Sequence, residues 1–236
     1  MLPDFQLVHA MQSGCTADFN EAMRRGATMR ARDLNGRCLL EVALRQGRPD
    51  LARRLLSLGA DPNEAIGKKG DHLIHLAART GDIGFLAVLL EAEVSPDCRG
   101  NLRRTALHHV TKGKFEFMVN MLLENGANPD AVDARGDTPL HLAAEVNSLS
   151  IIKLLLRYNA DASITNNQLY TPVHNAAAAG NTEVARLLLE HEQAIRPQHE
   201  SAELARRVLR VAELHGQDKT RLALTERLAG PALELH

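Results

Sequence analysis

The stretch Thr138-Pro139-Leu140-His141-Leu142-Ala143-Ala144 decides the fold, because its first four residues return at a fixed interval along the chain. Equivalent tetrads lie 33 residues before and 33 residues after it, as Thr105-Ala106-Leu107-His108 and Thr171-Pro172-Val173-His174. One interval further upstream, His72-Leu73-Ile74-His75 occupies the same frame. A fixed period of this length with a T-P-L-H core indicates an array of stacked repeats. Such an array favours holding another macromolecule over catalysis in a closed pocket.

The rest of each repeat keeps the same period. Paired leucines end a second helical segment, and they are Leu55-Leu56, Leu89-Leu90, Leu122-Leu123, Leu155-Leu156 and Leu188-Leu189. A short loop signature follows, as in Gly59-Ala60-Asp61 and Gly126-Ala127-Asn128. The spacing slips by one position near Ala65-Ile66-Gly67-Lys68, which predicts one inserted residue there. Each unit is too small to bury its own apolar face, so these leucines predict a continuous core made by stacking.

These residues resemble the ankyrin-repeat family over nearly the whole chain. The resemblance implies an all-α solenoid of stacked helix-turn-helix units with β-turn fingers and degenerate capping repeats at both ends. We expect one domain over residues 1–236, with an N-terminal cap at 1–29, five repeats at 30–197 and a C-terminal cap at 198–230. The tetrad threonine is expected to cap its helix, since its hydroxyl can accept from a free amide of the first turn. Proline fits the first helical position, where no N–H is needed.

The evenly spaced histidines allow two interpretations. Metal binding is one, but a spacing of one full repeat and the lack of a matching cysteine or carboxylate set argue against it. The family resemblance implies the other, in which the two ring nitrogens of each histidine bridge neighbouring finger loops. The sequence contains no phosphate-binding glycine loop, no H-E-x-x-H and no G-x-S-x-G. We therefore expect no enzymatic activity, no catalytic residues, no cofactor and no metal.

Composition restricts the partners. The formal net charge is −1, so the whole chain has no general attraction for nucleic acid or membranes. No apolar run approaches the length of a membrane-spanning helix, and the start Met1-Leu2-Pro3-Asp4 does not resemble a signal peptide. The three cysteines are scattered, which fits a reducing compartment. We expect a monomeric cytoplasmic protein that binds another protein and no nucleic acid; a mature exported form is the alternative.

The family frame predicts the binding surface, which consists of the finger tips and the exposed ends of the first helices. The partner-binding residues predicted there are Leu34, Arg37, Arg45, Lys68, Lys69, Asp71, Arg79, Leu102, Arg103, Arg104, Lys112, Arg135, Asp137 and Tyr170. With Glu145, this surface carries nine basic and three acidic residues, an excess of six positive charges. We expect it to meet an acidic surface of a partner protein, with the apolar tips as anchors. The alternative is that the arginines only maintain solubility and that Leu34 and Leu102 pack against the next finger.

The fifth repeat differs from the others. Its first helix ends in Ala176-Ala177-Ala178-Ala179 beside Tyr170, and a partner helix or loop could approach the backbone closely there. A poorly differentiated repeat next to the cap is the alternative. We expect a non-catalytic scaffold, with a stoichiometric inhibitor or immunity protein for an enzyme as the specific role. An adaptor, a secreted effector that binds a host protein, and polyanion binding are the alternatives.

Overall fold

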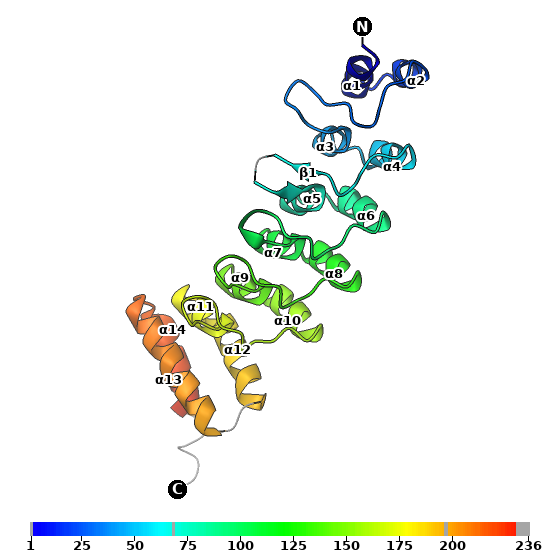
Figure 1. The fold of residues 1–236 in the computed structure, drawn as a ribbon. Helices are drawn as coiled ribbons and strands as arrows, with labels where there is room; N and C mark the ends of the chain where they lie inside the picture. The colour runs from blue at the N-terminus through cyan, green and yellow to red at the C-terminus, as the bar shows by residue number, and fades with distance from the viewer. Residues whose placement is uncertain (1, 68, 196–197, 230–236) are drawn as a thin grey trace. The chain divides into compact units, whose positions relative to one another are not determined.

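A computed structural model describes residues 2–67, 69–195 and 198–229, and within them the chain forms fourteen α-helices and one two-stranded sheet (Figure 1). The chain divides into two compact units. Unit 1 comprises residues 1–110 and 124–127, and unit 2 comprises residues 111–123 and 128–236. The all-α array of stacked helix pairs predicted from the sequence is confirmed, whereas the single domain and its cap boundaries stay predictions.

Unit 1 contains three helix pairs and the start of a fourth. Its elements are α1 (Pro3–Ser13), α2 (Thr16–Arg24), α3 (Leu39–Arg45), α4 (Pro49–Ser57), β1 (Ala65–Ile66), β2 (Asp71–His72), α5 (Leu73–Thr80), α6 (Ile83–Glu91) and the 3-10 helix η1 (Asn101–Arg103). Helix α7 (Ala106–Lys112) begins in this unit and ends in unit 2. First helices pack on first helices, as α1 on α3 and α3 on α5, while α4 packs on α6.

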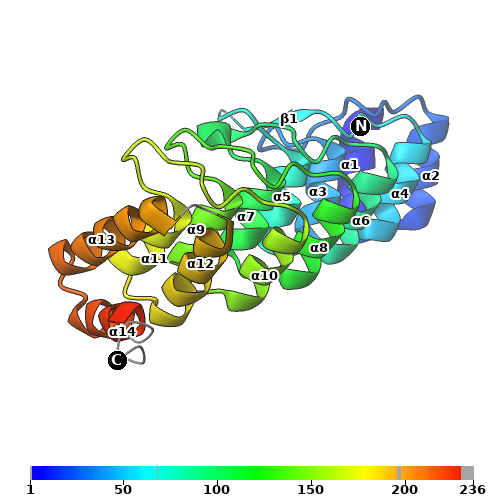
Figure 2. The same cartoon turned by 90° about the horizontal axis from the view of Figure 1, so that it is seen from below.

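Unit 2 continues the same pattern to the end of the described chain. Its helices are α8 (Glu116–Glu124), α9 (Pro139–Glu145), α10 (Leu149–Arg157), α11 (Pro172–Ala178), α12 (Thr182–Ile195), α13 (Gln198–Leu214) and α14 (Asp218–Ala229). Helix α11 packs between α9 and α13, and α12 packs on α14. The last three helices, α12, α13 and α14, are longer than those of the inner repeats (Figure 2).

The core consists of the periodic leucines and alanines. Leu55, Leu89, Leu122 and Leu155 are completely buried, as are the small residues Ala43, Ala77 and Ala143 that lie on first helices. Burying a leucine side chain stabilises a fold by about 2 kcal/mol, so the repeated leucines are the main source of stability in each unit.

Local sequence explains the helix ends. The Thr138 hydroxyl accepts a hydrogen bond from the His141 backbone N–H at 3.4 Å, and Pro139 follows at the first helical position, as predicted. Helix α6 uses Asp82 instead, whose carboxylate accepts from the Phe85 N–H at 2.9 Å. Both caps supply an acceptor for one of the four amides that a helix start leaves unpaired.

The fingers are tight turns held by one side chain. Oδ1 of Asp33 accepts from the N–H groups of Asn35 at 2.8 Å and Arg37 at 2.9 Å, and Asp133 and Asn166 make the same pair of bonds in later fingers. The second finger is one residue longer. Ala65 pairs with His72 there, whereas Arg32 pairs with Cys38 in the first finger, so the predicted insertion is confirmed.

Candidate partner-binding surfaces

The tetrad histidines hold neighbouring fingers together. Nδ1 of His141 accepts from the Thr138 N–H at 3.1 Å, and its Nε2 donates to the Tyr170 carbonyl at 2.8 Å. His75 makes the equivalent bonds with the His72 N–H at 3.0 Å and the Cys98 carbonyl at 2.8 Å. A ring nitrogen that donates and one that accepts define a neutral imidazole. Burial accordingly lowers the pKa of both His75 and His141. The bridging role implied by the family resemblance therefore holds at both positions.

His174 breaks this pattern. Its Nδ1 accepts from the Thr171 N–H at 3.3 Å, but among the described residues its Nε2 has no hydrogen-bond partner, although the side chain is almost completely buried. Helix α13 packs on α11, as α11 packs on α9. Burial, together with the nearby charge of Arg207, lowers the pKa of His174 to about 4. The fifth repeat thus keeps the histidine without the carbonyl that it normally binds.

One group of potential metal ligands was not recognised in the sequence. Ligand atoms of His72, His75 and Cys98 lie within 4.8 Å of one another, and Cys98 Sγ lies 3.3 Å from His72 Nδ1. Both ring nitrogens of His75 are already used by the finger bonds described above. His72 and Cys98 would remain as two ligands, fewer than the four of a structural zinc site. The cluster is best explained as part of the packing of the second and third fingers.

Three of the predicted cations of unit 1, Arg37, Arg45 and Arg79, contact carboxylates. Glu41, which takes the place of a tetrad histidine, is buried and contacts Arg45 at 2.9 Å and Arg37 at 3.8 Å. Asp71 contacts Arg79 at 3.0 Å. Burial raises the pKa of the Asp71 carboxyl, but the Asn101 N–H and the Arg79 guanidinium outweigh this effect and hold the pKa below its usual value.

The sequence-based charge count was therefore too high. Asp71 and Asp137 were expected at exposed tips, yet both are buried, and Asp33 and Glu41 were left out of the count. Among the described residues of unit 1, the predicted surface carries six cations, Arg37, Arg45, Lys69, Arg79, Arg103 and Arg104, above three carboxylates, Asp33, Glu41 and Asp71. The excess in unit 1 is thus three. Lys68 lies outside the described residues.

Two of these cations have no carboxylate partner in the described part of the chain. Lys69 and Arg103 are exposed and belong to the second and third fingers. The apolar tips nearby in sequence are also solvent-accessible, since Leu34 is 91% exposed and Leu102 is 54% exposed. Leu34 therefore does not pack against a neighbouring finger. Unit 1 presents cations and exposed leucines on the same set of loops.

The third finger has an unusual backbone. Leu102 and Arg103 both adopt left-handed conformations, with φ of 57° and 56°, which L-residues other than Asn and Asp seldom adopt. Gly100 stands where the first, fourth and fifth fingers carry Asp33, Asp133 and Asn166, and a Cβ atom there would lie 2.5 Å from Asp71 Oδ1. The glycine allows the Asn101 N–H to donate to Asp71 at 2.8 Å. Asp71 thereby fixes the base of a finger whose tip is strained.

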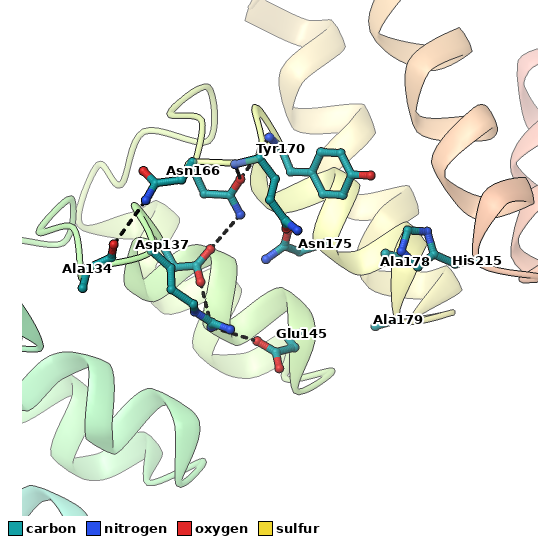
Figure 3. A pocket seen from close by; sticks show the side chains of 12 residues that line it. Ala134, Asp137, Glu145, Asn166, Tyr170, Asn175, Ala178, Ala179 and His215 are labelled. Atoms are coloured by element: carbon teal, nitrogen blue, oxygen red, sulfur yellow. Dashed lines mark hydrogen bonds and ion pairs between the residues drawn. The ribbon is translucent and has the colours of Figure 1, made fainter. Parts of the chain in front are cut away.

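Unit 2 contains a groove between its last two fingers, with a volume of about 520 Å³ (Figure 3). Its residues come from the finger loops, from α9 and α11, and from the segment after α13, and they are Ala134, Arg135, Asp137, Glu145, Asn166, Asn167, Gln168, Tyr170, Asn175, Ala178, Ala179 and His215. Arg135, Asp137 and Tyr170 were predicted from the sequence, as was the alanine strip beside Tyr170. Ala176 and Ala177 are buried in the core, and Ala178 and Ala179 line the groove.

Several groove residues were missed. Asn175 directly follows the tetrad His174, at a position where the preceding repeat has the buried Leu142, so its polarity was the available signal. Leu169 is 68% exposed with φ of 61°, next to Tyr170 at the tip of the same finger. His215 comes from the C-terminal helices, and no repeat pattern indicated it. Of the other predicted residues, Lys112 is exposed at the end of α7, while Arg104 is partly buried.

Comparison with known families agrees with this architecture. The model of three-copy ankyrin repeats matches residues 40–133, 73–166, 110–201 and 146–225. The chain belongs to the ankyrin-repeat family. Ankyrin repeats mediate protein–protein interaction through surfaces built on a constant scaffold. Alpha-latroinsectotoxin-Lt1a from Latrodectus tredecimguttatus is 32% identical over 97 residues, which is 38% of this chain and 7% of that protein. The described residues include no helix with the length and apolar character needed to cross a membrane.

Proposed function

We propose that this ankyrin-repeat chain is a non-catalytic scaffold whose unit 1 fingers bind an acidic surface of a partner protein. The observation that supports the proposal most is the combination of Lys69 and Arg103, two exposed cations without a carboxylate partner in the described chain, with the exposed Leu34 and Leu102. Opposite charge accelerates encounter and sets the register of a complex, and exposed apolar side chains supply affinity once water is excluded.

Within this proposal, stoichiometric inhibition of an enzyme is the specific role that we favour. The exposed cations and leucines of unit 1 lie on one set of fingers, and a surface of this kind is sufficient to cover the active site of an enzyme. An adaptor or a secreted effector that binds a host protein is the alternative. Polyanion binding has weaker support, because the three carboxylates beneath the cations of unit 1 reduce its positive charge and aromatic stacking residues are scarce.

A double charge reversal tests the proposed surface. Wild-type protein is used to capture partners from a lysate of the producing cells at low salt, and the captured protein is purified. Association is then measured for wild type and for the variant Lys69→Glu/Arg103→Glu. We expect association about tenfold slower for the variant, because both steering charges are inverted. Lys219→Glu, an exposed lysine of α14, is the matched control and should associate at the wild-type rate.

The outcomes separate the alternatives. Unchanged association of Lys69→Glu/Arg103→Glu contradicts the proposed surface. If the captured protein is an enzyme that stays fully active at equimolar scaffold, the inhibitor role is wrong and the adaptor role gains support. Binding of mixed-sequence RNA at moderate salt, with no protein captured, favours polyanion binding.

A further inference from the structure

The groove of unit 2 has the opposite charge to the fingers of unit 1. Two carboxylates, Asp137 and Glu145, line it together with a single guanidinium, that of Arg135. Arg135 contacts Asp137 at 2.7 Å and Glu145 at 3.7 Å, so one cation is shared by two anions (Figure 3). The groove therefore carries one uncompensated negative charge, and an anionic ligand would meet two carboxylates and a guanidinium that is already engaged.

The two carboxylates are not equivalent. Asp137 is buried and both of its oxygens are used, since Oδ1 accepts from Asn166 Nδ2 at 2.8 Å and Oδ2 from Arg135. Glu145 is 46% exposed, and its contact with Arg135 at 3.7 Å is an ion pair longer than a hydrogen bond. A carboxylate accepts about four hydrogen bonds, so Glu145 retains accepting capacity that faces the groove.

The other residues of the groove offer apolar contacts for the methylene groups of a long cationic side chain and hydrogen-bond acceptors for its charged group. Ala178 and Ala179 offer only methyl groups, on which a chain of methylenes can lie. Tyr170 stacks on His174 with ring centroids 5.6 Å apart, which fixes the orientation of its ring. His215 Nδ1 lies 2.9 Å from the Val211 carbonyl and donates to it, which fixes the orientation of the ring at the edge of the groove. The Asn175 side-chain amide adds a further oxygen acceptor.

We propose that the groove of unit 2 binds an arginine or lysine side chain of a partner segment, with its charge against Glu145. This inference rests on the proposed protein-binding function and names a feature of the partner: a cationic residue at one part of its surface and acidic residues at another. A volume of about 520 Å³ lies within the range of clefts that hold small ligands, so a side chain with its flanking backbone fits.

The experiment needs no partner. Nitrogen-15-labelled full-length protein is titrated with acetyl-arginine amide and with acetyl-lysine amide, and the backbone amide signals of Tyr170, Ala178 and Ala179 are followed by NMR. Acetyl-citrulline amide, a neutral analogue of the arginine probe, and acetyl-glutamate amide are the ligand controls. We expect the cationic probes to shift these three signals with half-saturation in the millimolar range, and the two probes rank arginine against lysine.

Matched variants test the role of Glu145. Glu145→Gln should raise the half-saturation concentration about fivefold, the effect of losing one partly exposed ion pair. Glu226→Gln, at an exposed position of α14, should bind like the wild type. The proposal is wrong if the citrulline probe shifts the same signals equally, if acetyl-glutamate amide binds as well, or if Glu145→Gln binds the cations unchanged. Because no partner is used, these outcomes are independent of the capture experiment on Lys69 and Arg103.

Discussion

The two units of this ankyrin-repeat chain share one frame and carry opposite charge on it. In unit 1 the fingers and first helices carry six cations and three carboxylates, and Lys69 and Arg103 remain exposed. In unit 2 the groove places two carboxylates around the single guanidinium of Arg135. The residues that build the frame are nearly invariant between repeats, whereas the finger residues are not. The charge of each unit is therefore set by its own residues outside the frame, and a variant can alter one surface and leave the other intact.

The largest expected effect is on the free energy of unfolding, and it follows from a change to the buried leucines of the repeats. Leu155→Asp places a charge without a partner in the core of unit 2, and we expect a loss of about 3–5 kcal/mol in the free energy of unfolding. Leu89→Asp is the corresponding change in unit 1. Chemical denaturation followed by circular dichroism measures both. Lys153→Asp, on the exposed face of α10, is the control, and equal midpoints for Leu155→Asp and Lys153→Asp would contradict the repeat frame.

His174 differs from His75 and His141 in the hydrogen bond of its Nε2, which has no partner among the described residues. The folded protein holds His174 neutral with a pKa of about 4, whereas an unfolded histidine has a value near 6.5. The unfolded state therefore binds a proton first as the pH falls. Neutral His174 therefore contributes about 3 kcal/mol to the free energy of unfolding. This contribution is complete above pH ~6.5 and is lost as the pH falls toward 4.

Melting temperatures between pH 7 and pH 4 check this expectation. His174→Gln should reduce the loss of stability at low pH, and His9→Gln, on the exposed side of α1, should leave it unchanged. The same slope in wild type and His174→Gln would mean that His174 finds an acceptor in solution, as His141 does with Tyr170.

The periodic part of the structure could be predicted from the sequence. Stacking requires the same residue at the same place in every repeat, so the buried leucines, the position of His141 and the inserted residue before Asp71 were visible as repeats or as breaks in them. The family resemblance implied the bridging hydrogen bonds of the histidine, and the 33-residue repeat interval gave its positions in the sequence.

The charges at the surface could not be predicted in the same way. Whether a finger residue is exposed depends on the next finger, because Asp71 is covered by Asn101 and Asp137 by Asn166. Glu41 belongs to the helix frame, so a count of tip residues left it out although it neutralises Arg45. His215 lines the groove from the segment after α13, where no repeat pattern marks its position.

The association rate of the complex with the natural partner should depend on ionic strength through the cations of unit 1. Raising the salt from 0.02 to 0.5 M should slow association through unit 1 by about tenfold, because the Debye length falls from roughly 20 Å to about 4 Å. The variant Lys69→Glu/Arg103→Glu should show a much smaller dependence. Surface plasmon resonance across a salt series measures both proteins, and an association rate independent of salt in the wild type would contradict electrostatic steering.

The smallest expected effect concerns the ion pairs that Arg79 and Arg135 make with Asp71 and Asp137, which occupy the same position in their fingers. Both arginines are half exposed and each aspartate keeps a second donor at 2.8 Å, so Arg79→Gln and Arg135→Gln should each reduce the free energy of unfolding by about 1 kcal/mol or less. Denaturation curves measure the loss. Binding separates the two variants, because only Arg135→Gln removes the cation that Glu145 shares. Arg135→Gln should therefore tighten binding of acetyl-arginine amide to the groove, while Arg79→Gln should leave it unchanged. Weaker binding by Arg135→Gln would mean that Arg135 orders the groove rather than competing with its ligand, and the contrast in charge between the two units would then lose its functional meaning.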